Sequence, residues 1–214
     1  MLRSTRELLR FDVTGRDGRI GEVTDFYFDE HDWKIEFMVL DTDGLFSDGK
    51  VLINMDYVSE LRFPEETFVL GLTNAQAKTL VSGATTPADV EGQVVRSKQA
   101  APQASDAILR SVETISSAGI FASDGPMGNI YSLLVETKTW SIRFLIVDTS
   151  HILPGKLVLL TTQAISRLDW DKKSVIASVT ADSLRKSPAY DVDSEISREY
   201  EAFLHDYYGW PKYW

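Results

Sequence analysis

Apolar and polar positions alternate along the first eighty residues with the period of β-strands. In the segment 33–41, aromatic and aliphatic side chains at the odd positions alternate with Lys34 and Glu36, which is typical of a half-buried strand. From Met38 onwards both faces of this segment are apolar. We therefore expect a strand that enters a hydrophobic core as it proceeds.

Turn signals divide the rest of this region into short strands. Asp17-Gly18 is a pair that accepts positive φ in a tight hairpin turn. The spacings Ser4-x-x-Glu7 and Thr73-x-x-Gln76 each predict a short capped helical turn. We expect strands at residues 11–15, 20–29, 33–41, 51–54, 58–62 and 67–70. Five or six short antiparallel strands within about 80 residues predict a small closed barrel, because closure removes exposed sheet edges.

The chain repeats itself at a distance of 107 residues. Positions 2–42 hold 11 residues that are identical to those 107 positions later, beginning with Leu-Arg-Ser at 2–4 and 109–111. Chance at ordinary composition gives roughly two or three identities over this length. Trp33 pairs with Trp140 in this alignment, so we expect these residues to occupy equivalent places in two copies of one fold.

The repeat sets the expected domain organisation. We expect a first barrel at residues 1–80, a linker at 81–106, a second barrel at 107–186 and a distinct tail at 187–214. The linker is rich in Ala, Thr, Ser, Gln and Gly and has no aromatic residue.

The tail combines helical periodicity with many aromatic rings. A helical stripe recurs at Ile196, Tyr200, Phe203, Leu204 and Tyr207, with Ser194 or Ser197 as N-cap and Gly209 as C-terminal cap. The candidate interaction surface consists of the seven aromatic residues of the tail: Tyr200, Phe203, Tyr207, Tyr208, Trp210, Tyr213 and Trp214. Two readings stay open. The rings either pack over the barrels and hold them in position, which we favour, or they form a peptide surface for a partner.

Composition and charge exclude several classes of function. The net charge of −10 opposes phosphate binding, so we expect no nucleic acid partner. No apolar run is long enough for a membrane helix and no secretory signal is readable, so we expect no membrane insertion and a cytoplasmic location. Residues 1–80 hold 16 acidic and 9 basic side chains, which favours a protein partner with a basic surface.

The sequence shows no grouping of residues typical of a catalytic or metal site, so we expect no enzyme, no cofactor and no metal site. The chain has no cysteine, and its histidines, His31, His151 and His205, lie in separate segments. The run Asp29 to Asp32 offers metal ligands, but adjacent side chains of a hairpin turn diverge and the second repeat lacks them. Asp41 and Asp148 end equivalent strands, where capping of loop amides is the favoured role.

Three patterns stand out in the first copy: Asp-Gly-x-Ile-Gly-x-Val at 17–23, Asp-Thr at 41–42, and Gly-Lys-Val-Leu-Ile at 49–53. This set resembles the PRC-barrel domain family, which includes the cytoplasmic part of the H subunit of purple bacterial reaction centres and the C-terminal domain of the bacterial ribosome maturation factor. The tail 207–214 resembles the ending of a bacterial subgroup with two tandem PRC-barrels. The resemblance implies an all-β fold of two tandem small antiparallel barrels followed by a short amphipathic helix. It carries no catalytic residue.

The leading hypothesis is a non-enzymatic module that binds or assembles proteins, with a homodimer as an open alternative. A second hypothesis, from the reaction-centre resemblance, is a peripheral component of a photosynthetic or other electron-transport complex. A third is an enzyme with an unrecognised site between the barrels.

Overall fold

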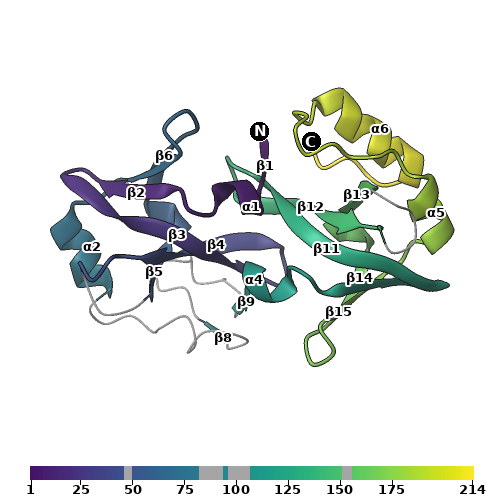
Figure 1. The fold of residues 1–214 in the computed structure, drawn as a ribbon, viewed down its shortest axis with the longest axis horizontal. Helices are drawn as coiled ribbons and strands as arrows, with labels where there is room; N and C mark the ends of the chain where they lie inside the picture. Colours follow the sequence, from purple (N-terminus) through teal and green to yellow (C-terminus); the bar gives the residue numbers. More distant parts are fainter. Residues whose placement is uncertain (46–49, 82–93, 96–106, 151–155) are drawn as a thin grey trace. The chain divides into compact units, whose positions relative to one another are not determined.

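The computed structural model describes residues 1–45, 50–81, 94–95, 107–150 and 156–214 (Figure 1). The chain forms two compact units, and each unit takes residues from both repeats. We call Thr5–Glu113 with Thr139–Ser141 the N unit, and Met1–Ser4 with Thr114–Lys138 and Ile142–Trp214 the C unit.

The N unit is built on a mixed sheet in the order β6-β7-β2-β3-β4-β5, with β9 paired to the end of the long strand β3 that β2 does not reach. Its elements are α1 (Thr5–Leu8), β2 (Asp12–Gly15), β3 (Gly18–Asp29), β4 (Lys34–Asp41), β5 (Lys50–Asn54), a 3₁₀ turn (Met55–Tyr57), β6 (Val58–Arg62), β7 (Thr67–Leu70), α2 (Asn74–Val81), β8 (Val94–Val95) and β9 (Ala107–Ser111). Phe26, Phe28 and Phe68 are fully buried in its core.

The C unit repeats this order as β14-β15-β10-β11-β12-β13, with β1 paired to the end of the long strand β11 that β10 does not reach. Its elements are β1 (Leu2–Ser4), β10 (Gly119–Ala122), β11 (Gly125–Glu136), β12 (Ser141–Asp148), β13 (Leu157–Thr161), a 3₁₀ turn (Thr162–Ala164), β14 (Ile165–Asp169), β15 (Ser174–Ala177), α5 (Ala181–Lys186) and α6 (Arg198–Tyr208). The short helix α4 (Val112–Ile115) spans the boundary at which the chain passes from the N unit to the C unit.

The expected fold of two closed antiparallel barrels is wrong in two respects, although the chain is mostly β as expected. First, β2 pairs with β7 and β10 with β15 in parallel, so the sheet is mixed. Second, the sheet is open. The strands β5 and β6 at the ends of the N-unit order are joined by the 3₁₀ turn, and β6 pairs with β7 instead of β5. The turn redirects the chain, so these two strands form no ladder.

The repeat is confirmed in the backbone geometry. Three pairs of non-glycine residues with positive φ lie 107 positions apart, namely Arg10 and Ser117, Trp33 and Trp140, and Glu66 and Lys173. The helix-capping hydrogen bonds also match. The Asp17 carboxylate accepts from the Asn74 amide at 2.7 Å, and Asp124 accepts from the Ala181 amide at the same distance. Trp33 and Trp140 therefore occupy equivalent backbone positions, as expected.

Two glycines of the repeat lie where strands approach closely. A Cβ at Gly21 would lie 2.1 Å from the Asp41 carbonyl oxygen, and one at Gly128 would lie 2.0 Å from that of Asp148. No side chain fits at such a distance. The carboxylates of the same two aspartates accept loop amides, from Asp43 at 3.0 Å and from Ser150 at 2.8 Å. The prediction that Asp41 and Asp148 cap loops is confirmed.

The first strand of each repeat pairs outside its own repeat. Strand β1 from the first repeat pairs with β11 of the second, and β9 from the second repeat pairs with β3 of the first. The registers match at the spacing of 107, because Leu2 lies opposite Glu136 and Leu109 opposite Asp29. The two repeats have thus exchanged their first strands.

Most of the expected linker lies outside the described residues, as does His151. Within the linker, Val94–Val95 forms β8 and pairs with β9. The boundaries at residues 80, 106 and 186 stay predictions. In the part of the chain that the structure describes, no helix combines the length and apolar character needed to cross a membrane.

Candidate functional site

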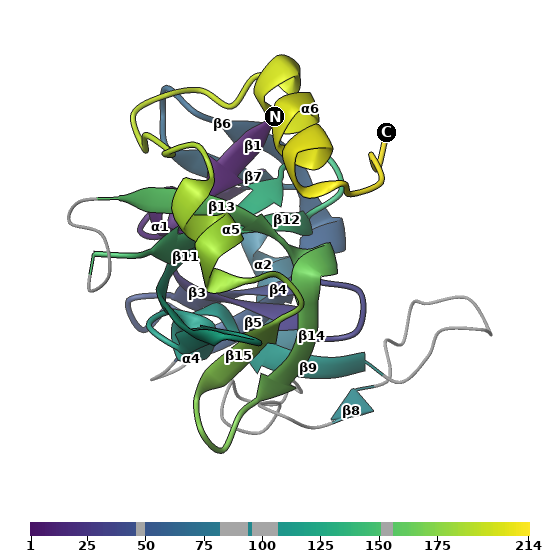
Figure 2. The ribbon, with the colours of Figure 1, turned by 90° about the vertical axis from the view of Figure 1, so that its right-hand side faces the viewer.

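The C-terminal helix α6 has well-defined ends. The Ser197 side chain caps its start by accepting from the Tyr200 amide at 3.2 Å, which decides between the two expected caps. At its end Gly209 adopts the left-handed conformation with φ of 70°, and the Trp210 amide donates to the His205 carbonyl at 2.8 Å. Figures 1 and 2 show α6 beside the β13 end of the C unit.

The buried face of α6 differs from the expected stripe. Leu204 is fully buried in a cluster with Leu2, Leu134, Phe144, Ile146 and Leu159, and Ile196, Tyr200 and Tyr208 pack against that cluster. By contrast, Phe203 and Tyr207 are 53% and 39% exposed. Two members of the predicted stripe therefore face solvent. The prediction omitted Glu201 and His205, which are buried on the same face as Leu204.

Polar partners explain why Glu201 and His205 are buried. Tyr213 donates a short hydrogen bond to the Glu201 carboxylate, and Arg198 lies 3.3 Å from it. His205 Nδ1 lies 2.9 Å from the Pro211 carbonyl oxygen. The segment after Gly209 thus returns along the helix and gives each side chain a polar partner, as a buried carboxylate such as Glu201 requires, while His205 Nε2 has no hydrogen-bond partner among the described residues.

Aromatic rings of the tail surround His205 and the arginines beside it. The ring centroids of Trp214, Tyr213, Phe144 and Trp210 lie between 5.3 and 6.2 Å from that of His205. The guanidinium of Arg143 lies 4.2 Å from the centre of the Tyr213 ring, and that of Arg198 lies 4.5 Å from the Trp214 ring. Burial and the hydrogen bond to Glu201 raise the pKa of Tyr213 above its ordinary value, and burial raises the pKa of Tyr208 to about 12. Both hydroxyls stay protonated at neutral pH.

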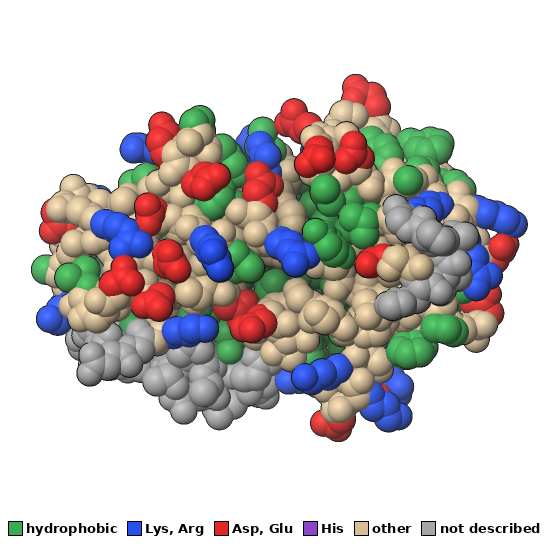
Figure 3. All heavy atoms as spheres, in the orientation of Figure 1, with side chains coloured by type: hydrophobic (Ala, Val, Ile, Leu, Met, Phe, Trp, Pro, Cys, Tyr) green, Lys and Arg blue, Asp and Glu red, His purple; other side chains and the backbone are tan. Residues whose placement is uncertain are grey.

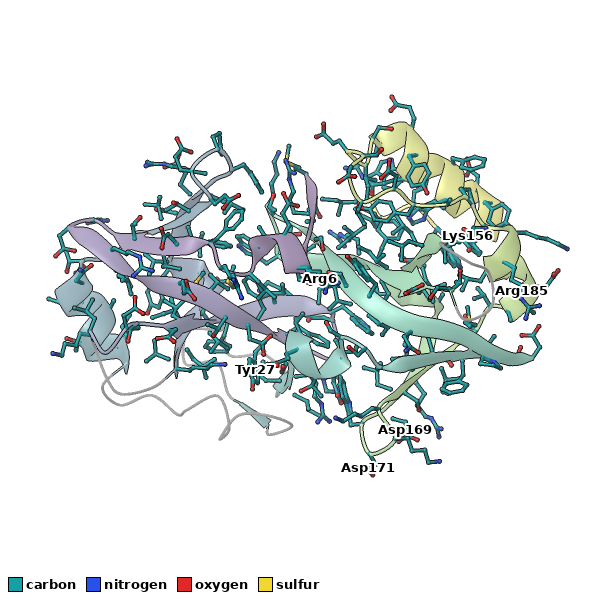
Figure 4. All side chains as sticks on the ribbon, in the orientation of Figure 1. Arg6, Tyr27, Lys156, Asp169, Asp171 and Arg185 are labelled. Atoms are coloured by element: carbon teal, nitrogen blue, oxygen red, sulfur yellow. The ribbon has the colours of Figure 1, made fainter. Side chains whose placement is uncertain are left out.

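The seven aromatic residues of the candidate interaction surface therefore divide into two groups. Phe203, Tyr207 and Trp214 are exposed, whereas Tyr200, Tyr208, Trp210 and Tyr213 are half-buried within the C unit. Only the first group offers apolar area to another molecule. Tyr207 also anchors the helix, because its hydroxyl donates to the Ser183 carbonyl of α5 at 2.9 Å. Lys156 fixes the far end of α5 by donating to the Arg185 carbonyl at 2.5 Å (Figure 4).

A cavity of about 190 Å³ opens where the start of the chain meets the tail of the C unit. Its lining includes Met1, Leu2, Glu136, Arg198, Glu201 and Tyr213. Glu136 is paired with Arg143, and Glu201 with Arg198 and Tyr213, so the charges around the cavity are compensated.

The acidic turn after β3 serves the fold of the N unit. Asp29 Oδ1 lies 3.1 Å from His31 Nδ1 and accepts from the Ile108 amide of β9 at 3.3 Å, while Glu30 pairs with Arg110 of β9 at 2.7 Å. The Asp32 carboxylate accepts from the Lys34 amide. Among the described residues, no three histidine or acidic side chains are grouped as a metal site would require.

In the N unit, the sequence analysis also missed the buried titratable residue Asp25. This side chain is 5% exposed and accepts from the Ser111 hydroxyl at 2.6 Å, the Phe26 amide at 2.8 Å and the Glu113 amide at 3.1 Å. Burial raises its pKa to about 6 in spite of these hydrogen bonds. A charged residue within the apolar run 23–28 was the available signal. Because its main partners come from β9 and α4, its role here is to hold the exchanged strand.

Comparison with protein families gives one match. The family model of the PRC-barrel domain matches residues 3–70, which reach from β1 to the end of β7. A search of curated proteins found no match to the chain. The matched region holds the crowded Gly21, the loop cap Asp41 and the strands that the second repeat reproduces. Residues 3–70 of this chain are therefore a PRC-barrel domain.

Proposed function

We propose that this protein is a non-enzymatic module that binds another protein, with the solvent face of α6 as its contact surface. The supporting observation is the pair Phe203 and Tyr207, which lie one helical turn apart and are exposed although the opposite face of the helix is packed. Aromatic side chains are enriched at the centres of protein interfaces, because they bury a large area at a small cost in conformational entropy.

The charge around this pair favours a basic partner. The tail 187–214 holds six acidic and two basic side chains. On α6 itself, Glu199 and Asp206 are exposed, and Figure 3 shows carboxylates and apolar side chains side by side over the helix. A basic surface that carries one or two apolar side chains complements this arrangement. Its charge would set the rate and orientation of encounter more than the final affinity.

The fixed roles of the acidic side chains support the non-enzymatic part of the proposal. Asp25, Asp41 and Asp148 accept backbone amides, and Glu201 is held by Tyr213 and Arg198. Each of these groups stabilises a local structure. A general base, by contrast, needs an accessible lone pair directed at a substrate.

A pair of matched variants tests the proposed surface. Phe203→Asp alters the exposed face of α6, while Phe121→Asp alters another exposed aromatic residue, on β10. We expect both variants to melt like the unaltered protein. A partner isolated with the unaltered chain should be basic and should bind less tightly at high salt. Its affinity should fall at least tenfold for Phe203→Asp and stay unchanged for Phe121→Asp. Equal binding by both variants would show that α6 is not the contact surface.

A further inference from the structure

The edges of β3 and β11 accept the same tripeptide. Leu2-Arg3-Ser4 pairs antiparallel with β11, and Leu109-Arg110-Ser111 pairs antiparallel with β3 in the equivalent register. The ladder between β1 and β11 continues by one residue, since the Thr137 amide donates to the Met1 carbonyl at 3.0 Å. One short sequence thus fits two separate edges, which indicates that each edge selects for side chains as well as for an extended backbone.

Two positions of the tripeptide account for this selection. The leucine enters an apolar cluster in both units: Leu2 contacts the cluster of Phe144 and Leu204, and Leu109 that of Tyr27 and Val39. The serine hydroxyl meets a buried polar side chain two strand positions away, because Ser4 lies 2.7 Å from Ser132 and Ser111 lies 2.6 Å from Asp25. Each of the two edges therefore favours a segment with an apolar residue and, two residues later, a hydroxyl group.

The polar side chains that hold β9 differ from those at the equivalent places beside β1. Arg110 of β9 pairs with Glu30, and Asp25 holds both Ser111 and Glu113. In the C unit, Thr137 stands in the place of Glu30 and Ser132 in the place of Asp25, so neither carboxylate has a counterpart there. In addition, β9 pairs with β8 on its second edge. The edge of β11 thus holds its strand without the two carboxylates that hold β9 on β3.

The cavity next to β1 borders this edge. It adjoins Met1 and Leu2 and reaches towards Arg198, Glu201 and Tyr213. Its volume of about 190 Å³ leaves space beside Met1 and Leu2 for a side chain of a bound segment.

We propose that the edge of β11 is a peptide-binding slot, which β1 fills within the chain and which an extended Leu-x-Ser segment of a partner polypeptide fills by displacing β1. Binding would follow the mode in which a peptide adds a strand to a sheet edge, with backbone pairing for affinity and the leucine and serine positions for specificity. This proposal goes beyond the surface proposed on α6 and is independent of it, because Phe203 is exposed and belongs neither to the cluster around Leu2 nor to the lining of the cavity.

The test uses a fluorescent peptide with the sequence of residues 1–6 and the full-length chain. In Leu2→Ala the internal strand lacks its apolar anchor and competes less well for the slot. We expect the peptide to bind Leu2→Ala at least tenfold more tightly than the unaltered chain, as measured by fluorescence anisotropy. A peptide with alanine in place of leucine should lose this preference, and Ser132→Val in the Leu2→Ala background should weaken binding.

Two outcomes would overturn the proposal: no binding to a Leu2→Ala chain that keeps its melting transition, or equal binding of the leucine and alanine peptides. If Leu2→Ala does not fold, a peptide with a photoreactive leucine is applied to the unaltered chain. Cross-links to Leu134, Phe144, Ile146, Leu159 or Leu204 support the slot, and cross-links elsewhere or none contradict it. Phe203→Asp should bind the peptide unchanged, so that failure of the α6 surface and failure of the slot are distinguishable.

Discussion

At the scale of single residues, burial decides what each polar group does. Asp25 and Asp41 both lie in the sheet region of the N unit. Asp41 is exposed and caps a loop, whereas Asp25 is buried and holds the exchanged strand β9. The cost of burying the Asp25 carboxylate appears in its pKa of about 6. Because the folded pKa lies above the ordinary value of 3.8, the folded state binds the proton more tightly than the unfolded chain does. The stability that follows from this difference is present at low pH and declines as the pH rises from about 4 to above 6.

Asp25→Asn should therefore flatten the dependence of stability on pH. The amide keeps the shape of the side chain and cannot ionise. When the pH is raised from 4.5 to 7.5, the free energy of unfolding of the variant should therefore rise by about 2 kcal/mol relative to that of the unaltered protein. Urea unfolding at both pH values measures this gain. Asp171→Asn, at the exposed tip of the β14–β15 hairpin (Figure 4), is the matched control and should show no such trend. A parallel pH profile for Asp25→Asn and the unaltered chain would contradict the assignment.

At the scale of elements, the orientation of α6 follows from the groups that its neighbours can satisfy. Periodicity alone favoured a stripe through Phe203 and Tyr207, whereas the packed face contains Glu201, Leu204 and His205.

Adjacent substitutions on α6 should therefore differ sharply in their effect on stability. Leu204→Ala removes a fully buried side chain and should cost about 3 kcal/mol of stability. Phe203→Ala should change stability by less than about 0.5 kcal/mol. Denaturant unfolding of both variants compares them, and a larger loss for Phe203→Ala would show that the helix is turned the other way.

At the scale of the whole molecule, the exchange of strands makes each unit depend on both repeats. Neither repeat contains all the strands of one unit, because β1 belongs to the first repeat and lies in the C unit, while β9 belongs to the second and lies in the N unit. The effect of a substitution should therefore appear in the unit where the strand lies.

Leu109→Ala tests this dependence. It lies in the second repeat, yet its side chain is buried with Tyr27 and Val39, so it should lower the protection of β3 amides against hydrogen exchange and cost about 3 kcal/mol. Leu2→Ala, the equivalent change in the first repeat, should lower protection of β11 instead. If Leu109→Ala loosened β11 and spared β3, the strands would not be exchanged in solution.

The sequence alone determined the features that depend on near neighbours. Strands such as Thr67–Leu70, the helix caps around Gly209, and the loop caps Asp41 and Asp148 were predicted correctly, since each follows from interactions within a few residues. The repeat of 107 residues likewise predicted the equivalence of Trp33 and Trp140.

Only the tertiary structure decided which edges meet. The two Leu-Arg-Ser segments are identical, so their sequence fits either edge equally and contains no information on which repeat each one joins. The parallel pairing of β2 with β7, the open sheet, the burial of Asp25 and the rotation of α6 also depend on contacts between residues far apart in the chain. Such contacts are set by packing and by the cost of burying a polar group without a partner, which no local pattern records.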